Sequence, residues 1–527
     1  MNVWIARLTW VAGGWIALVS TAAAEVRLPH VFGNHMVLQR DAPVPVWGWA
    51  DAGETVTVSI RGQSQTAQPE ADGRWRVTLD PLAVGEPATL TVKGANTIEL
   101  QDVLIGEVWV CSGQSNMEWP IRRSLDPDLE SLTASHPGLR LFTVPRKASA
   151  EPQTDVDAEW TACTPRSVRD FSAVAYFFGR QLHETLGVPV GLINTSWGGT
   201  RAEAWTSAEG MASRAELQPI LDTWAARIDE FQKPETQASY EQALEAWKTA
   251  AEEAKAKGER EPRKPNPPVD PTHHHDRSST LYNGMIAPLT PFAIRGAIWY
   301  QGESNAGRAY QYRTLMPALI RSWRAAWGQG DFPFYQVQLA NFMAPKDEPG
   351  DSAWAELREA QHLTAETEKN VGCACIIDLG AIKDIHPKDK QNVGKRLARL
   401  ALVDLYGFAG KVTRSGPTYR SMTIENGRCI LHFDNLGEGE LRGLSGWYGD
   451  PLRGFAIAGA DRKFVWAEAK VEGDTVVVSS ESVPEPLAVR YNWADNPNGN
   501  LCNGAMLPAY PFRTDDWEGV TAKNLTP

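Results

Sequence analysis

The sequence predicts an α/β protein in which a doubly wound parallel sheet is flanked by N- and C-terminal β-sandwich-like modules. Residues 25–103 show only strand and turn patterns, residues 104–410 alternate strands with helices, and residues 411–527 return to strand patterns. Strand–helix alternation favours a parallel sheet with helices on both faces. A chain of 527 residues is also too long for one ordinary domain.

The first 24 residues have the pattern of a secretory signal peptide. Arg7 supplies a short basic region, residues 8–19 form an apolar run, and residues 22–24 are alanines that suit a cleavage site. The apolar run is short for a membrane-spanning helix. We therefore expect cleavage after Ala24 and a mature protein that is secreted or periplasmic, with no membrane partner.

Charge and cysteine content narrow the possible partners. A formal net charge of −12 argues against nucleic acid or an anionic membrane surface as a partner. Six cysteines permit one or two disulfides outside the cytoplasm, but the sequence does not indicate a pairing. Cys373 and Cys375 alternate within a buried strand pattern, so packing on one face is favoured over metal binding.

Short β-rich segments separated by turn residues predict the two flanking modules. Segments such as "PVPVWGWADAGETVTVSI" in residues 25–103 and "GFAIAGADRKFVWAEAKVEGDTVVVSS" in residues 411–527 are rich in β-branched and aromatic residues. Gly, Asp and Pro interrupt them at short intervals, which is typical of small sandwiches.

The central region is predicted to contain at least five strands and four helices. Parallel strands place their carboxyl ends at one edge, where ligands bind in folds of this class. The strands are expected at residues 107–111, 189–195, 294–300, 334–339 and 371–379, and the helices at residues 172–187, 310–327, 352–368 and 392–407.

Residues 210–277 interrupt this alternation with a helical insertion. In "SYEQALEAWKTAAEEAKAKG" the residues Tyr240, Leu244, Trp247 and Ala251 recur at helical spacing. We expect a capping box formed by Ser239 and Gln242, a helix end at Gly258, and packing of the insertion on the sheet domain. A polar, Pro-rich connector follows.

Ser115 is the first candidate for chemistry, because the strand in "GEVWVCSGQSNMEWP" stops abruptly in a tight turn that contains it. The turn is similar to a nucleophile elbow, yet Met117 stands where G-x-S-x-G has its second glycine, which disfavours an ordinary α/β-hydrolase. Serine is also common in turns without chemistry. A nucleophile therefore needs a base, an acid and oxyanion donors elsewhere in the chain.

Asp384 and His386 in "DIHPKDK" follow a buried strand and precede a helix, so they belong at the same sheet edge. A histidine there can accept the serine proton, and a carboxylate on its other nitrogen fixes the tautomer. The plainer alternative is a loop histidine beside a helix-capping aspartate.

Two further strand ends offer hydrogen-bond donors. "NTSWGGTRAEAW" contains Gly198 and Gly199, whose backbone N–H groups can approach a ligand closely. "WYQGESNA" contains Gln301 and Asn305, which carry side-chain amides. Donors of both kinds directed at one oxygen form an oxyanion hole.

Together these motifs resemble the sialate O-acetylesterase family, within the SGNH (GDSL-like) hydrolases. The resemblance rests on "GEVWVCSGQSNMEWP", "NTSWGGTRAEAW", "LYNGMIAPL", "WYQGESNA" and "DIHPKDK", and it extends through "FAIAGADRKFVWAEA" and "AVRYNWADNPNGNLCNGAMLPAYPFRT" over nearly the whole mature chain. It implies a flavodoxin-like SGNH-hydrolase sheet and a carbohydrate O-acetylesterase without a metal or organic cofactor.

The resemblance also implies roles for individual residues. Ser115 matches the nucleophile, His386 the base and Asp384 the acid, with Asp378 as the alternative because SGNH enzymes more often use D-x-x-H. For the oxyanion hole it implies the amides of Ser115 and Gly199 with Gln301, and Asn305 as the alternative to Gln301.

The substrate is expected to be an acetylated oligo- or polysaccharide, either a hemicellulose such as xyloglucan or xylan, or O-acetyl sialic acid. Trp119, Trp197 and Trp205 could stack on sugar rings, while Arg201 and Glu303 lie in the motif turns as further binding candidates. A non-catalytic carbohydrate-binding protein and a glycoside hydrolase with paired carboxylates are the alternatives. The run His273, His274 and His275 is interpreted as a solvated segment beside the pocket rather than a metal site.

Overall fold

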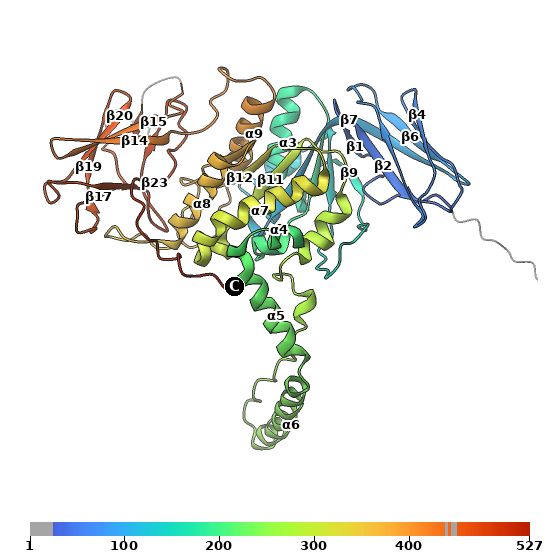
Figure 1. The fold of residues 1–527 in the computed structure, drawn as a ribbon, viewed down its shortest axis with the longest axis horizontal. Helices are drawn as coiled ribbons and strands as arrows, with labels where there is room; N and C mark the ends of the chain where they lie inside the picture. The colour runs from blue at the N-terminus through green and yellow to red at the C-terminus, as the bar shows by residue number, and fades with distance from the viewer. Residues whose placement is uncertain (1–24, 438–440, 444–450) are drawn as a thin grey trace, which may run out of the picture.

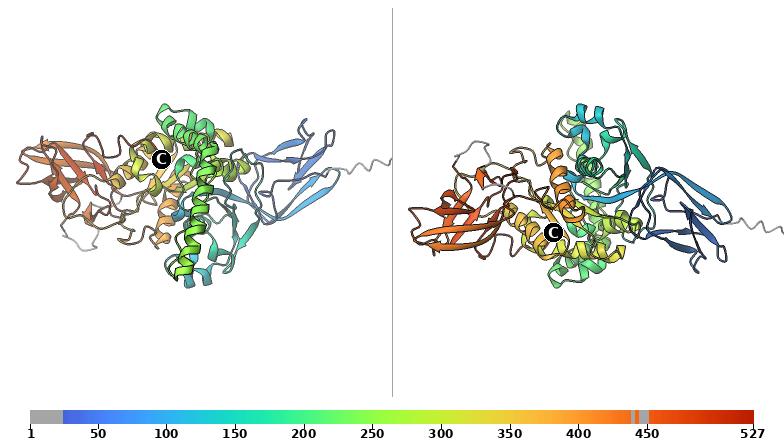
Figure 2. Two further views of the ribbon diagram at one scale, coloured as in Figure 1. Left: turned by 90° about the horizontal axis from the view of Figure 1, so that it is seen from below. Right: turned by 90° about the horizontal axis from the view of Figure 1, so that it is seen from above.

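The computed structural model describes residues 25–437, 441–443 and 451–527. The expected signal peptide lies outside these residues. A central α/β body has a β module at each end, and a pair of helices projects from one side of the body (Figure 1). Figure 2 shows the same order from two further directions, with the N-terminal and C-terminal modules well separated.

The N-terminal module consists of two small sheets. In one, β2 (Val44–Trp49) pairs with β5 (Arg74–Leu79); in the other, β3 (Val56–Ile60) lies between β4 (Gln63–Ala67) and β6 (Ala88–Lys93). Alternate residues of β5 are buried, as expected of a strand with one face toward a core. This core is continuous with that of the central body.

The long strand β7 (Thr97–Gly113) connects the N-terminal module to the central sheet. Its first part pairs with β6 up to Val103, and β1 (Val37–Gln39) pairs with it from Leu104. Further along, β10 (Val190–Asn194) pairs with β7 from Glu107 and β11 (Gly296–Tyr300) pairs with it from Trp109. The change of partners occurs where the sequence changes from strand-only to strand–helix patterns. A continuous strand, rather than a flexible linker, therefore joins the two parts.

The central sheet has the strand order β13-β12-β11-β7-β10-β8-β9, and its neighbouring strands are parallel except at the β8–β9 edge. All five expected strands are present, although β13 ends earlier than predicted because the chain turns after it. The sequence patterns missed β8 and β9, which are interrupted or short. Their bounds are β8 (His136–Thr143), β9 (Trp160–Cys163), β10 (Val190–Asn194), β11 (Gly296–Tyr300), β12 (Phe334–Val337) and β13 (Val371–Ala374).

Helices cover both faces of this sheet. On one face Trp109 of β7 packs edge-on against Phe178 of α3, with ring centroids 5.0 Å apart. On the other, Trp299 of β11 packs against Trp323 of α7 at 5.9 Å. The pair α3 and α9 and the pair α7 and α8 form separate layers (Figure 1). Their bounds are α3 (Ala173–Leu186), α7 (Ala309–Trp327), α8 (Ala353–Thr367) and α9 (Lys390–Leu405), and the short helices are α1 (Ser115–Glu118), α2 (Pro127–Thr133) and α4 (Ala208–Ala212).

The direction of chain progression changes at β7. After β7 the chain forms β8 and β10 on one side of it, and then β11, β12 and β13 on the other side. In open parallel sheets a ligand crevice lies beyond the carboxyl ends of the strands at such a point. The segments that contain Ser115, Gly199, Gln301 and His386 all follow carboxyl ends of these strands.

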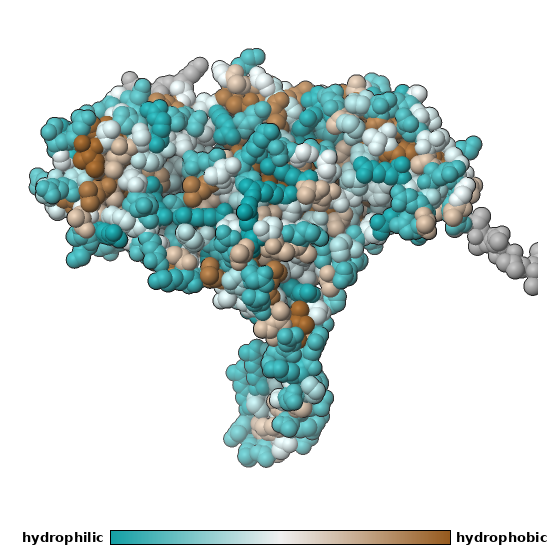
Figure 3. Space-filling view, viewed as in Figure 1, coloured by the Kyte–Doolittle hydropathy of each residue, from teal (hydrophilic) through white to brown (hydrophobic). Residues whose placement is uncertain are grey.

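The helical insertion packs on the sheet domain, as expected, only through its first part, where Leu217, Ile220 and Trp224 belong to the same buried core as the central sheet. Helices α5 (Gln218–Gln232) and α6 (Pro234–Lys257) extend away from the body (Figure 1), and α6 begins at Pro234 rather than at a Ser239 capping box. The surface of the projecting part is largely hydrophilic (Figure 3). The indole N–H of Trp247 donates a hydrogen bond to the Pro262 carbonyl, so the Pro-rich connector lies against this residue of the apolar stripe. Gly258 ends the helix in a left-handed conformation, as predicted.

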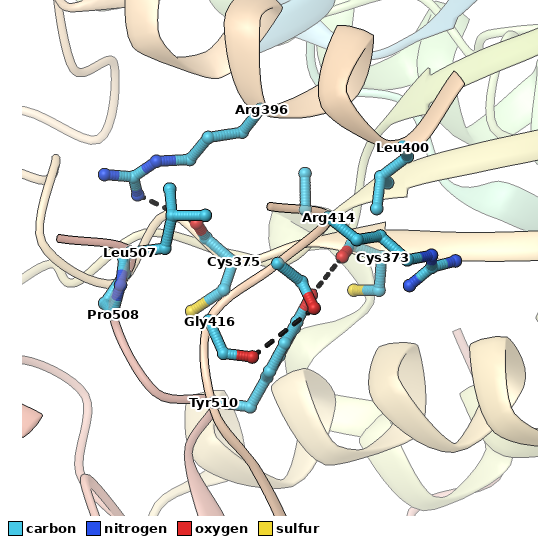
Figure 4. A pocket seen from close by; sticks show the side chains of 11 residues that line it. Cys373, Cys375, Arg396, Leu400, Arg414, Gly416, Leu507, Pro508 and Tyr510 are labelled. Carbon is cyan, nitrogen blue, oxygen red and sulfur yellow. Dashed lines mark hydrogen bonds between the residues drawn. The ribbon is translucent and has the colours of Figure 1, made fainter. Parts of the chain in front are cut away.

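The C-terminal region contains two four-stranded antiparallel sheets around a separate core. Figure 4 shows its contact with the central body, where the Tyr510 hydroxyl donates a hydrogen bond to the Cys373 carbonyl of β13. The strands are β14 (Thr418–Glu425), β15 (Arg428–Asp434), β16 (Arg442–Gly443), β17 (Phe455–Ala458), β18 (Val465–Trp466), β19 (Glu468–Glu472), β20 (Thr475–Ser479), β21 (Ala488–Tyr491), β22 (Leu501–Cys502) and β23 (Phe512–Arg513).

All six cysteines are described, buried and unpaired. Cys373 and Cys375 pack in a small apolar cluster with Tyr510. Within the described part of the chain, no helix combines the length and apolarity needed to cross a membrane.

Candidate active site

Ser115 is the first residue of the short helix α1 and follows the end of β7. The backbone reaches it through Gly113, whose φ is +141°. A Cβ at this glycine would lie 2.1 Å from the Tyr300 carbonyl oxygen, so only glycine permits β7 and β11 to approach so closely here. The resulting turn leaves Ser115 partly exposed at the sheet edge.

His386 and Asp384 lie beside this serine. The His386 Nε2 atom is 2.9 Å from Ser115 Oγ, and its Nδ1 atom is 3.4 Å from Asp384 Oδ1. The same Asp384 oxygen accepts the backbone N–H of His386 at 2.9 Å. With a proton on Nδ1 facing the carboxylate, Nε2 is free to accept the serine proton. The structure thus brings Ser115 close to Asp384 and His386, although Ser115 and His386 are 271 positions apart in the sequence.

The surroundings of His386 favour its neutral form. Burial lowers the pKa of His386 below its ordinary value, and the positive charge of Lys390 lowers it further, while Asp384 acts in the opposite direction. Trp119 supplies much of the apolar contact, since its ring stacks on the imidazole. A neutral imidazole is the form that can act as a base.

Asp378, the alternative acid, is engaged elsewhere. Its two carboxylate oxygens accept hydrogen bonds of 2.5 and 2.7 Å from the Arg396 guanidinium. This bidentate pair holds the side chain at the start of the segment that leads from β13 to His386. The carboxylate facing the imidazole is that of Asp384.

The expected role of Gln301 as an oxyanion donor is wrong for this structure. Gln301 is completely buried, and its side-chain amide donates to the Thr200 carbonyl and to Asn305 Oδ1 at 3.1 and 2.6 Å. Asn305, the alternative, donates its amide to Glu203 at 2.8 Å. Both side chains are buried and stabilise the strand ends; Gln301 uses both of its N–H donors and Asn305 uses one.

Backbone donors remain at the expected positions. The Ser115 and Gly199 N–H groups have no acceptor among the described residues. Gly199 is exposed with φ +78°, and the space where a Cβ would lie is open. The preceding Gly198 lies against the serine, because a Cβ placed on it would be 3.2 Å from Ser115 Cβ. Its own N–H is directed at Glu118 at 2.8 Å.

The three tryptophans proposed to stack on sugars already contact protein groups or are buried. Trp119 stacks on His386, and Arg123 lies over its ring at 5.5 Å. Trp197 stacks on His275 with centroids 5.4 Å apart. Trp205 is fully buried, so its expected contact with a sugar ring is wrong.

Arg201 and Glu303 have different surroundings from each other. Arg201 is partly exposed, has no carboxylate partner among the described residues, and lines an open hollow of about 350 Å³ together with Ser304. Glu303, expected to bind substrate, instead accepts a hydrogen bond from the Asn116 side chain at 2.6 Å beneath the nucleophile turn. The expectation for Glu303 is therefore wrong.

The histidine run is only partly solvated. His274 and His275 stack on each other at 4.5 Å and are partly buried, while His273 is exposed. Candidate ligand atoms of His274, His275 and Asp276 lie within 4.8 Å of one another. The Nδ1 atom of His274 already accepts the Asp276 backbone N–H, which removes the lone pair on that nitrogen from metal binding.

Sequence reasoning missed Asn116 and Lys390. Asn116 follows the nucleophile directly, and Lys390 is four residues after His386, at the start of α9. Both are buried polar residues that the motif "GQSN" and the segment "DIHPKDK" contain. The sequence signal that could have identified Lys390 was its position four residues after the candidate base His386.

Comparisons with known proteins identify related sequences and a related structure. Residues 271–403 match the family model described as "carbohydrate esterase, sialic acid-specific acetylesterase". The chain is 31% identical to sialate O-acetylesterase of Mus musculus over 94% of this chain and 96% of that protein, and 32% identical to that of Rattus norvegicus, with the same coverage.

A solved structure extends the similarity to three dimensions. A carbohydrate acetylesterase from Xanthomonas citri superposes with a TM-score of 0.78 and 37% identity, over 94% of this chain and all of that chain. The agreement spans the α/β body and both β modules. The chain belongs to the sialate O-acetylesterase family of carbohydrate esterases.

Proposed function

We propose that this protein is a serine esterase that removes O-acetyl groups from carbohydrates. Family membership supports the coarser part of this statement, that the protein is a carboxylic ester hydrolase acting on acetylated carbohydrate. The hydrogen bond of 2.9 Å between Ser115 Oγ and His386 Nε2 carries the finer part, because it pairs a nucleophile with a base.

In the proposed reaction Ser115 Oγ attacks the acetyl carbonyl carbon while its proton passes to His386 Nε2. The carbon–oxygen bond to the sugar then breaks, and the sugar oxygen takes that proton as it leaves. Water attacks the acetyl-enzyme in the second half, giving its proton to His386, and acetate departs as Ser115 Oγ is protonated again. Asp384 stabilises the imidazolium that forms in each half.

The developing oxyanion is proposed to be bound by the backbone N–H groups of Ser115 and Gly199. Both lack an acceptor among the described residues; Ser115 begins the nucleophile turn, and Gly199 directly follows Gly198, which lies against Ser115. Loss of one such donor typically lowers the rate by about 10²–10³-fold.

The parallel sheet, with the nucleophile after β7 and the base after β13, supports assignment of the central body to the SGNH hydrolases. The composition of residues 1–24 supports export to the periplasm or the medium. The SGNH assignment and the export of the protein are therefore both parts of the proposed function.

The substrate is proposed to be a neutral acetylated polysaccharide of the hemicellulose type, with O-acetyl sialate as the competing candidate. A net charge of −12 disfavours approach of a polyanion and has no effect on a neutral polymer. Arg201 is the observation that favours sialate, since it is accessible and has no carboxylate partner among the described residues.

The test is acetate release from a panel of acetylated xyloglucan, acetylated xylan and 9-O-acetyl sialic acid, with wild type and Ser115→Ala. We expect release from at least one substrate by wild type and none by the variant. Release of reducing sugar without acetate would identify a glycoside hydrolase. Binding without any turnover would identify a carbohydrate-binding protein.

A further inference from the structure

A buried polar network lies directly beneath the nucleophile turn. The Lys390 ammonium donates to Asn116 Oδ1 at 2.5 Å, and the Asn116 amide donates to Glu303 Oε1 at 2.6 Å. Lys390 and Asn116 are almost completely buried, and the second oxygen of Glu303 is enclosed without a hydrogen-bond partner. None of these atoms is in the proposed path of the acetyl group.

Asn116 connects the nucleophile to the base. It follows Ser115 in the chain, and its amide also donates to the Ile385 carbonyl at 3.0 Å. Ile385 precedes His386, so a single side chain joins the turn after β7 to the loop after β13. Because those segments come from distant parts of the sequence, this hydrogen bond helps to set the distance between Ser115 and His386.

Lys390 places a positive charge in this network. Its ammonium lies over the Tyr300 ring at 5.1 Å, which is favourable for a cation. Burial lowers the pKa of Lys390 to about 7, against the opposing attraction of Glu303, Asp384 and Asp389. Burial likewise raises the pKa of Glu303. The lysine is therefore charged below about pH 7.

We propose that Lys390 and Asn116 are positioning residues: Asn116 holds Ser115 in register with His386, and the Lys390 charge keeps the imidazole unprotonated in mildly acid solution. The inference rests on the proposed esterase mechanism. Glu303, Asp384 and Asp389 are the acidic groups whose attraction favours the ammonium form of Lys390. The network thereby extends the working range of the base toward lower pH.

The sign of the effect follows from the groups that surround His386. Lys390 and Arg123 lower the pKa of the imidazole, Asp384 raises it, and Trp119 contributes burial. Removing the Lys390 charge therefore raises the pKa of His386. The acidic limb of the rate profile then moves to higher pH, since only the neutral imidazole accepts the serine proton.

The experiment compares Lys390→Met, Lys390→Arg and Asn116→Ala with wild type. Lys395→Met is the matched control, because it removes an exposed positive charge from the same helix. kcat/KM for a simple acetyl ester is measured across pH, and thermal unfolding verifies that each variant is folded.

Lys390→Met is expected to move the acidic limb to higher pH, whereas Lys390→Arg and Lys395→Met keep it in place. Asn116→Ala is expected to lower kcat/KM by about 10- to 100-fold at every pH without moving the limb, as for small displacements of catalytic groups. An unmoved limb in folded Lys390→Met would refute the charge effect. Full activity in Asn116→Ala would refute the positioning role.

A second readout separates this inference from the proposed function. The His386 ring proton is followed by NMR during pH titration of histidine-labelled protein, with His386→Gln to assign it among the 10 histidines. A higher His386 titration midpoint in Lys390→Met supports the charge effect even in the absence of esterase activity. An unchanged midpoint overturns it. Absence of acetate release by wild type counts only against the proposed function.

Discussion

The imidazole of His386 lies parallel to the indole of Trp119, with ring centroids 4.6 Å apart and an angle of 14° between the planes. The stack joins the candidate base to the motif that contains the nucleophile. The indole N–H is directed at the Arg123 carbonyl at 2.8 Å, which fixes the orientation of the ring. Trp119 thus supports the base rather than offering this face to a sugar.

Replacing Trp119 with alanine should expose His386 to water. Burial is the largest cause of the lowered pKa of His386, so the pKa should rise toward its ordinary value of about 6.5. The acidic limb of kcat/KM should move to higher pH, and kcat should fall more than KM changes. Trp119→Phe keeps an aromatic face and is expected to retain most activity. A fall in binding alone would instead indicate a sugar-stacking role.

His386→Ala should reduce kcat by about 10⁴-fold or more, and Ser115→Ala/His386→Ala should be no worse than either single variant. Nucleophile and base act as a unit, so their losses do not add. The measurement is acetate release by each folded variant. Losses that multiply in the double variant would show that the two residues act independently.

Asp384→Asn should be milder than His386→Ala. The carboxylate is 48% exposed and 3.4 Å from the imidazole, so the loss should be smaller than the roughly 10⁴-fold seen where a triad aspartate is buried and tightly bonded. Because Asp384 raises the pKa of His386, the variant should have its acidic limb at lower pH. Asp378→Asn provides the comparison, and a larger effect there would move the acid role to Asp378.

Arg201→Ala should distinguish the two substrate classes. If O-acetyl sialate is the substrate, its carboxylate would bind the Arg201 guanidinium, which has no carboxylate partner in the described part of the chain, and the variant would lose kcat/KM for sialate through a higher KM. We expect instead that wild type prefers acetylated xyloglucan or xylan and that the variant changes this activity little. Arg122→Ala is the matched control, since Arg122 is paired with Asp170 at 2.5 Å. A sialate preference that disappears only in Arg201→Ala would reject the neutral substrate.

Lys390→Met should alter the pH dependence of stability as well as activity. The pKa of Lys390 falls to about 7 on folding, from an ordinary value near 10.5. Between these values the unfolded chain binds more protons than the folded one, so this lysine makes folding more favourable as pH rises. The variant should lose that increase. Denaturant unfolding at about pH 7 and pH 9 measures the difference between the two proteins, and equal pH dependence would contradict the lowered pKa.

The sequence determined the family and, apart from β8 and β9, the strands and the long helices of the central body. Hydrophobic periodicity and the motif turns are local properties, so they can be recognised without the fold. The predicted helix α3, for example, begins at the capping Ser172 and ends at Gly187, as local rules require. The motif that contains Ser115 likewise identified a turn at the end of a buried strand.

Tertiary structure alone decided which side chains face the reaction. Gln301 and Asn305 carry suitable amides, yet both are buried and donate to Thr200 and Glu203, which are distant in sequence. Lys390 and Asn116 had no local signature because their contact spans 274 positions. Burial and hydrogen-bond partners are properties of the packed chain, and a buried donor that has found one acceptor is no longer available to another.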